Sequence, residues 1–123
     1  MNKDNTPKIL YADFEEANRI VMRYSLEHGG YAMIEAVDGI DAVNKVKEKD
    51  ISLVIMEIRL PNMSGYEAAR IIRATHEDMP IIALTSFTAE QVMEEATEAG
   101  FNTVLQKPYD SKQLLETIAT YLK

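Results

Sequence analysis

Five short apolar runs alternate with stretches of helical spacing, and this alternation constrains the fold more than any other feature of the sequence. Several runs are continuous rather than strictly alternating, as expected for a parallel sheet that is covered on both faces. The runs are residues 8–12, 31–35, 53–56, 81–84 and 103–105. Strict alternation of strands and helices with short connections predicts an α/β domain of five βα units, with a doubly wound parallel sheet.

The stretches between these runs carry the apolar stripes of helices. The stripes are Ala17, Ile20, Val21 and Tyr24; Ala89, Val92, Met93, Ala96 and Ala99; and Leu114, Leu115, Ile118 and Leu122. Three helix starts have the spacing of a capping box, namely Ser64 with Glu67, Thr88 with Gln91 and Asp110 with Gln113. Gly29, Gly30 and Gly100 are expected to end helices, because glycine accepts the left-handed conformation.

Length and composition predict one soluble globular domain spanning residues 1–123, since the chain is 46% hydrophobic and 27% charged. No apolar stretch approaches the roughly 20 residues that cross a bilayer. The polar segment 1–5 lacks the apolar middle of a secretion signal. No cysteine is present, which excludes disulfides and thiolate metal sites and favours a cytoplasmic location. The net charge of −7 opposes direct binding to nucleic acid.

Polar residues stand where four of the predicted strands end. Asp13 follows the first strand, Glu57 ends the third, Thr85 ends the fourth and Lys107 follows the fifth. Ligands of open α/β sheets bind beyond the carboxyl ends of the strands. These residues therefore predict one functional site at this edge of the sheet.

Motifs along the whole chain are similar to those of two-component response-regulator receiver domains. They are residues 9–15 with an acidic cluster, residues 53–67 around the phosphorylation position, residues 83–86 with a hydroxyl group, residues 100–102 with a glycine turn, and Gln106-Lys107-Pro108. The resemblance covers about residues 7–122. It implies a flavodoxin-like fold with strand order 2-1-3-4-5 and a cis peptide bond before Pro108.

The resemblance also implies a phosphoryl-transfer site. In the family, two adjacent acids after the first strand and the phosphorylated aspartate hold Mg²⁺, together with a backbone carbonyl that is here the carbonyl of Arg59. Mg²⁺ prefers such oxygen ligands. Thr85 and Lys107 correspond to the residues that contact the phosphoryl oxygens, where metal and lysine neutralise developing charge.

The sequence departs from this pattern at three positions. Phe14 replaces the second acid and offers no oxygen, Glu57 occupies the phosphoacceptor position, and Val104 replaces the aromatic switch residue. We therefore expect neither a Mg²⁺ site nor a catalytic residue, and slow or absent phosphorylation. Glu57 has two interpretations. Its carboxylate lies about one C–C bond further out than that of aspartate, and could partly imitate a phosphoryl group; alternatively, it pairs with Lys107 and keeps a buried acid satisfied.

The leading hypothesis is a stand-alone, degenerate receiver that is not an enzyme and acts by protein–protein interaction. Expected partners are a histidine kinase or a downstream output protein, bound through the fourth helix, fifth strand and fifth helix, with no membrane contact and with homodimerisation left open. The alternatives are an atypical receiver that still accepts phosphate, and an engineered constitutive or knockout variant of an ordinary response regulator. An unrelated enzyme on this scaffold is disfavoured, since no glycine-rich phosphate loop follows the first strand.

Four further features have ordinary explanations. His28 and His76 are expected at the surface, and Met33, Met56 and Met93 are expected to fill the core. The repeat Glu90, Glu94 and Glu98 predicts a solvated helix face, with an acidic docking stripe as the alternative. Ser86 is a weaker candidate for modification than Glu57.

Overall fold

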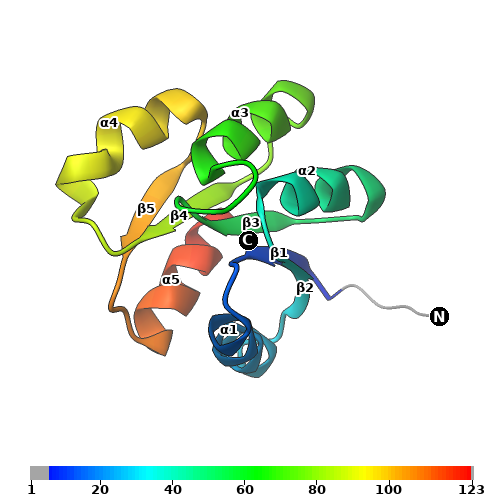
Figure 1. Cartoon of the computed structure of the whole chain (residues 1–123). Helices are drawn as coiled ribbons and strands as arrows, with labels where there is room; N and C mark the ends of the chain where they lie inside the picture. The colour runs from blue at the N-terminus through cyan, green and yellow to red at the C-terminus, as the bar shows by residue number, and fades with distance from the viewer. Residues whose placement is uncertain (1–5, 123) are drawn as a thin grey trace.

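The computed structural model describes residues 6–122, and the segment 1–5 and Lys123 lie outside this range (Figure 1). Five strands and five helices alternate along it. They are β1 (Lys8–Ala12), α1 (Glu16–His28), β2 (Ala32–Ala36), α2 (Gly39–Glu48), β3 (Leu53–Glu57), α3 (Gly65–Thr75), β4 (Ile81–Thr85), α4 (Ala89–Ala99), β5 (Thr103–Gln106) and α5 (Ser111–Tyr121). None of the described helices is both long and apolar enough to span a membrane.

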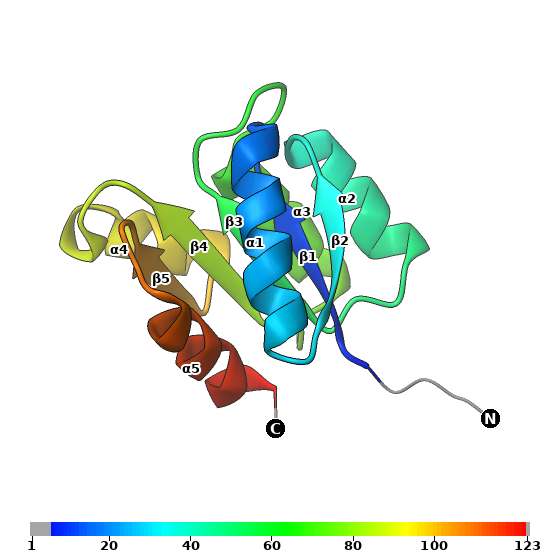
Figure 2. The same ribbon diagram turned by 90° about the horizontal axis from the view of Figure 1, so that it is seen from below.

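The strands form one parallel sheet in the order β2-β1-β3-β4-β5, which confirms the predicted topology. Helices α1 and α5 lie on one face of the sheet, and α2, α3 and α4 lie on the other (Figures 1 and 2). The register sets Ala12 beside Met56, and Glu57 beside Leu84. The carboxyl ends of β1, β3 and β4 therefore meet at one edge.

Each face of the sheet has its own hydrophobic core. On the α2–α3–α4 side, residues such as Leu10, Val54 and Ile72 are at most 1% exposed. On the α1–α5 side, Tyr11, Met22 and Ile118 are equally buried. Burial on both faces explains the continuous apolar runs in the sequence.

The helix caps agree with the sequence prediction except at the end of α1. Complete capping boxes begin α3, at Ser64 and Glu67, and α4, at Thr88 and Gln91. At α5, Asp110 accepts a hydrogen bond from the Gln113 backbone. Gly100 ends α4 with φ of 107°, whereas after α1 the left-handed residue is Gly30, with φ of 94°, and not Gly29. The cis peptide bond between Lys107 and Pro108 is confirmed.

The apolar stripe that the sequence shows on α1 faces solvent and not the sheet. Such a stripe usually faces the core, yet Ile20, Val21 and Tyr24 are 63%, 63% and 66% exposed. Met22 and Leu26 pack against the sheet instead.

The methionine prediction needs one correction. Met33 and Met56 are buried as expected, but the prediction for Met93 is wrong, because its side chain is 39% exposed on the outer face of α4.

The loop between β3 and α3 packs closely against its surroundings. A Cβ atom at Gly65 would lie 2.3 Å from the carbonyl oxygen of Glu57, and the Gly65 amide donates to the carbonyl of Ile58. Only glycine fits there without movement of the backbone of β3. Asn62, in the same loop, adopts φ of 69° and donates to Asp38.

Strand β2 forms one edge of the sheet, and its outward carbonyls are bonded to cationic side chains. Arg23 donates to the carbonyl of Met33 at 3.0 Å, and Lys45 donates to the carbonyl of Glu35 at 2.7 Å. Arg19 also pairs with the carboxylate of Glu35. The exposed backbone of β2 is thereby bonded from both neighbouring helices.

Candidate functional site

The four polar residues that the sequence singles out reach the same edge of the sheet. Glu57 and Thr85 are the last residues of β3 and β4, while Asp13 and Lys107 directly follow β1 and β5. Asp13 and Thr85 are the only buried polar residues among the described residues, at 4% and 3% exposure. Burying a polar group is costly unless it is bonded, so the partners of these side chains define the site.

Asp13 is held by three donors. Its Oδ2 accepts a hydrogen bond from the Tyr11 hydroxyl at 2.6 Å and one from the Asn18 amide at 3.1 Å. Its Oδ1 accepts from the backbone amide of Glu15 at 2.9 Å. Burial, followed by the bond to Asp13, raises the pKa of Tyr11 far above its ordinary value, so Tyr11 acts as a donor.

Glu57 forms an ion pair with Lys107, whose ammonium contacts Oε2 of the carboxylate. The Glu57 side chain is 12% exposed and the Lys107 side chain 28%. Burial raises the pKa of Glu57 above its ordinary value, Lys107 opposes this shift, and the nearby charges of Asp13 and Glu15 add to it. The pair therefore sets a carboxylate and an ammonium group against each other where β3 ends.

Thr85 and Arg59 are tied to the loop between β4 and α4. The backbone amide of Phe87 donates to Oγ1 of Thr85 at 3.1 Å. The guanidinium of Arg59 lies over the ring of Phe87, 5.2 Å from its centroid. The loop after β4 therefore has one contact with the last residue of β4 and one with the segment that follows β3.

Phe14 and Val104 do not join this group of side chains. Phe14 is 64% exposed, and its backbone carbonyl, like that of Asp13, accepts a hydrogen bond from Arg19. Val104 is partly buried and packs against the core on the α2–α3–α4 side. Within residues 6–122, no three histidine, cysteine, aspartate or glutamate side chains come together as a metal-binding group.

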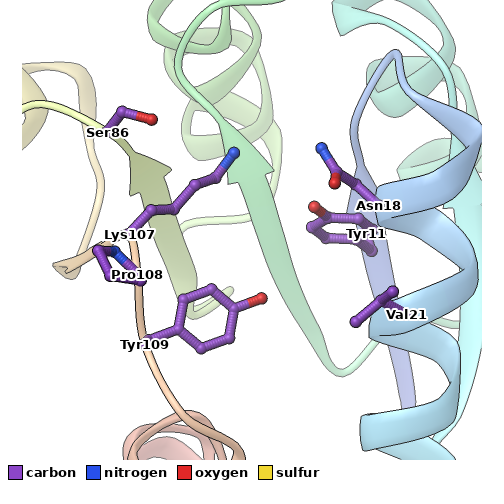
Figure 3. A pocket seen from close by; sticks show the side chains of 7 residues that line it. All are labelled: Tyr11, Asn18, Val21, Ser86, Lys107, Pro108 and Tyr109. Carbon is purple, nitrogen blue, oxygen red and sulfur yellow. The ribbon is translucent and has the colours of Figure 1, made fainter.

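A cleft of about 540 Å³ opens between α1 and the segment after β5. Its lining residues are Tyr11, Asn18, Val21, Ser86, Lys107, Pro108 and Tyr109. In Figure 3 the Lys107 amine and the Tyr109 hydroxyl both point across the cleft toward the α1 side. Burial, together with the charges of Glu57 and Asp13, raises the pKa of Tyr109 to about 12.

Sequence reasoning missed Tyr11, Asn18, Tyr109 and Phe87. Tyr11 could have been found, because residues two apart on a strand face the same side, and Tyr11 precedes Asp13 by two. Phe87 and Tyr109 lie in loops and Asn18 in the first turn of α1. The sequence pattern does not predict where side chains at such positions point.

Residues 9–119 match the family model of the response regulator receiver domain. Together with the βα topology and the acid, hydroxyl and lysine at one sheet edge, this match defines the class of protein. The chain belongs to the response regulator receiver domain family of two-component signalling.

Three known proteins illustrate the similarity. The chain is 32% identical, over 94% of its length, to the CAI-1 autoinducer sensor kinase/phosphatase CqsS of Vibrio cholerae, and spans only 17% of that protein. The receiver domain of sensor histidine kinase PA1611 of Pseudomonas aeruginosa, solved with magnesium in its active site cleft, has a TM-score of 0.88 and 31% identity, covering 95% of this chain and 98% of that one. The receiver domain of Ssk1 of Saccharomyces cerevisiae, solved with the histidine phosphotransfer protein Ypd1, has a TM-score of 0.87 and 26% identity, covering 94% of this chain and 88% of that one.

Proposed function

We propose that this receiver domain signals by protein–protein contact and has an impaired phosphoacceptor. The observation that carries this proposal is the ion pair between Glu57 and Lys107. The carboxylate at the acceptor position and the lysine that would contact phosphoryl oxygens are already paired with each other. A receiver with this ion pair keeps its site in one state and does not alternate between an unphosphorylated and a phosphorylated one.

The residues at the sheet edge do not fit Mg²⁺. The ion requires near-octahedral oxygen ligation, and Phe14 has no side-chain oxygen and points into solvent. Asp13 already accepts three hydrogen bonds, and Glu57 is engaged by Lys107. Glu15 adds a charge near Glu57, but its carboxylate is exposed and accepts a hydrogen bond from Asn18, and the carbonyl of Arg59 is a neutral ligand. These contacts support a domain without the magnesium ion that the PA1611 receiver holds.

Phosphoryl transfer depends on charge neutralisation around the attacking carboxylate. In this domain the lysine is committed to Glu57, and the Thr85 hydroxyl is oriented by the amide of Phe87. A phosphodonor would have to break the ion pair before it met a nucleophile. We therefore infer slow or absent phosphorylation, whether Phe14 and Glu57 arose naturally or were introduced.

Glu57 imitates a phosphorylated aspartate only in part. Its contact with Lys107 resembles what a phosphoryl oxygen would make, but a carboxylate carries one negative charge, against about −1.5 to −2 for a phosphoryl group. Val104 provides neither an aromatic ring nor a hydroxyl to respond. The proposed state is consequently a fixed one, with binding and not catalysis as its output.

The proposed contact surface for a signalling partner is the α4–β5–α5 face. It carries the exposed Met93 and the exposed acids Glu90 and Glu94, whereas Glu98 lies on the side of α4 that faces α3, 3.6 Å from Arg70. CqsS is by name a sensor kinase, and the Ssk1 receiver was solved with a histidine phosphotransfer protein. A kinase or phosphotransfer protein is accordingly the proposed partner, and the cytoplasmic location stays a prediction.

Intact-mass spectrometry after incubation with acetyl phosphate and Mg²⁺ tests the proposal. We expect no added phosphoryl group on the chain. The matched control is the double variant Phe14→Asp, Glu57→Asp, which returns two carboxylates to the site and should gain one phosphoryl group. A phosphoryl gain on the unaltered chain would overturn the proposal. If neither protein gains one, the impairment extends to the bonds that Tyr11 and Asn18 make to Asp13.

A further inference from the structure

The four most exposed large apolar side chains of the described residues lie in or directly before one helix. Phe14, Ile20, Val21 and Tyr24 are between 63% and 66% exposed, whereas the other exposed apolar side chains reach 45% at most. Single exposed apolar residues are normal on a protein surface, but a contiguous group of them marks an interaction site. The proposed signalling face on α4, β5 and α5 does not include these residues.

On α1 these residues form a continuous stripe. At 100° per residue, Ala17, Val21, Tyr24 and His28 fall within about 60° of one another, and Ile20 lies about 40° beyond. The stripe is about 16 Å long at 1.5 Å per residue. All five of these residues are exposed, and Figure 2 shows α1 in front of the sheet with no described helix over it. The ring of His28 extends the stripe by lying 4.3 Å from the ring of Tyr24.

We propose that this stripe, called the α1 stripe, binds the α1 stripe of a second copy of the chain, with the two helices antiparallel. A two-fold axis near Ile20 sets Ala17 of each copy opposite Tyr24 of the other. A small side chain therefore faces a large one at both ends of the contact, and the two Ile20 side chains meet at its centre. The antiparallel direction also opposes the two helix dipoles favourably.

Charges beside the stripe match the same arrangement. Glu16 and Arg23 lie on one flank of α1, about 20° apart around the helix axis. With the axis between Ile20 and Val21, Glu16 of one copy falls within two residues of Arg23 of the other, about 3 Å along the helix, which two long side chains can span. The Arg23 side chain is 40% exposed and lies 3.8 Å from the carboxylate of Glu27. Its guanidinium can therefore bind a second carboxylate while it donates to the carbonyl of Met33. An interface with a two-fold axis makes this contact twice.

The size of the α1 stripe predicts a weak dimer. An aromatic side chain carries roughly 150–250 Å² of surface, and about two-thirds of Phe14 and of Tyr24 is exposed. With Ile20 and Val21 the stripe reaches the few hundred Å² of a typical large surface patch. A standard interface buries about 800 Å² per partner. We therefore expect dimers at micromolar to near-millimolar concentration.

Sedimentation velocity of the full chain across that concentration range tests the surface. We expect a monomer–dimer equilibrium that Ile20→Glu weakens by at least about tenfold, because it buries a charge at the centre of the contact. The control Ile40→Glu makes the same change to an exposed apolar residue on α2, outside both proposed contact surfaces, and should leave the equilibrium unchanged. A chain that stays monomeric throughout, or one whose dimer is broken by Ile40→Glu and not by Ile20→Glu, would overturn the proposal.

A mixing experiment tests the antiparallel register. Glu16→Lys and Arg23→Glu each set like charges against each other in their own homodimers, so each protein alone should be monomeric. A mixture restores both opposite-charge contacts and should form a heterodimer. Circular dichroism spectra that match the unaltered chain exclude misfolding as the cause. Failure of the mixture to associate while both variants stay folded would refute the antiparallel arrangement. Neither experiment involves phosphoryl transfer, so the outcome is independent of the proposed function.

Discussion

Replacing Lys107 with methionine tests whether the ion pair at the sheet edge is a fixed part of the fold. Methionine keeps an unbranched side chain of similar length but removes the ammonium group. Glu57, with a side chain only 12% exposed, would then keep a carboxylate without its cation. No other cationic side chain within residues 6–122 is paired with Glu57.

The burial of the two partners sets the size of the effect. Removing one member of a fully buried pair costs about 3–5 kcal/mol, whereas an exposed pair contributes roughly 0–1 kcal/mol. Since Lys107 is 28% exposed and Glu57 12%, we expect a loss of about 1.5–3 kcal/mol in the free energy of unfolding at pH 7. For a chain of this length that corresponds to a fall in Tm of roughly 5–15 °C.

The loss should depend on pH in a defined direction. Burial raises the pKa of Glu57, and Lys107 opposes that shift, so the variant should have a still higher pKa there. A carboxyl group whose pKa is raised on folding contributes stability at pH values below its ordinary pKa, which is 4.5 for glutamate. That stability is lost as pH rises through the folded pKa. The deficit of the variant is therefore largest at pH values above the folded pKa of its Glu57 and shrinks as pH falls toward 4.5.

Urea unfolding followed by circular dichroism measures this in a double-mutant cycle. The four proteins are the unaltered chain, Lys107→Met, Glu57→Gln and the double variant. We expect a coupling energy of about 1–2 kcal/mol between the two positions. If Lys107→Met costs the same beside Glu57 as beside the neutral glutamine, the ion pair does not constrain the site and the reasoning above fails.

Two further substitutions test other contacts at this edge. Gly65→Ala should destabilise the domain by about 2 kcal/mol or more in urea unfolding, because its Cβ would lie 2.3 Å from the Glu57 carbonyl oxygen. Gly30→Asn is the control, since Gly30 has no atom within 4 Å of a Cβ and asparagine tolerates its positive φ; an equal loss in both would contradict the steric argument. Tyr11→Phe should cost about 1–3 kcal/mol by removing a buried bond to Asp13, and an unchanged Tm would show that this bond contributes nothing.

The sheet and the edge that carries the site could be predicted because both depend on local pattern. Apolar runs specify strands, the helices between them specify a parallel order, and Asp13, Glu57, Thr85 and Lys107 each stand at a strand end. The resemblance supplied the strand order and the cis bond.

Side-chain direction was harder to predict. Helical spacing shows that Ile20 and Tyr24 share a face of α1, but it does not say whether that face meets the sheet or solvent. Here Met22 and Leu26 fill the core instead. The bonds that hold Asp13 depend likewise on the packing of α1 against β1, which brings Asn18 to its carboxylate.

The hydrogen bonds along β2 have a consequence for how other molecules can meet this domain. An edge strand normally offers its free backbone groups to an extended peptide, which joins the sheet as an extra strand. Arg23 and Lys45 already bond the outward carbonyls of Met33 and Glu35, so an arriving peptide would have to displace both. Strand addition at β2 is thus opposed by side-chain hydrogen bonds from both helices that flank it.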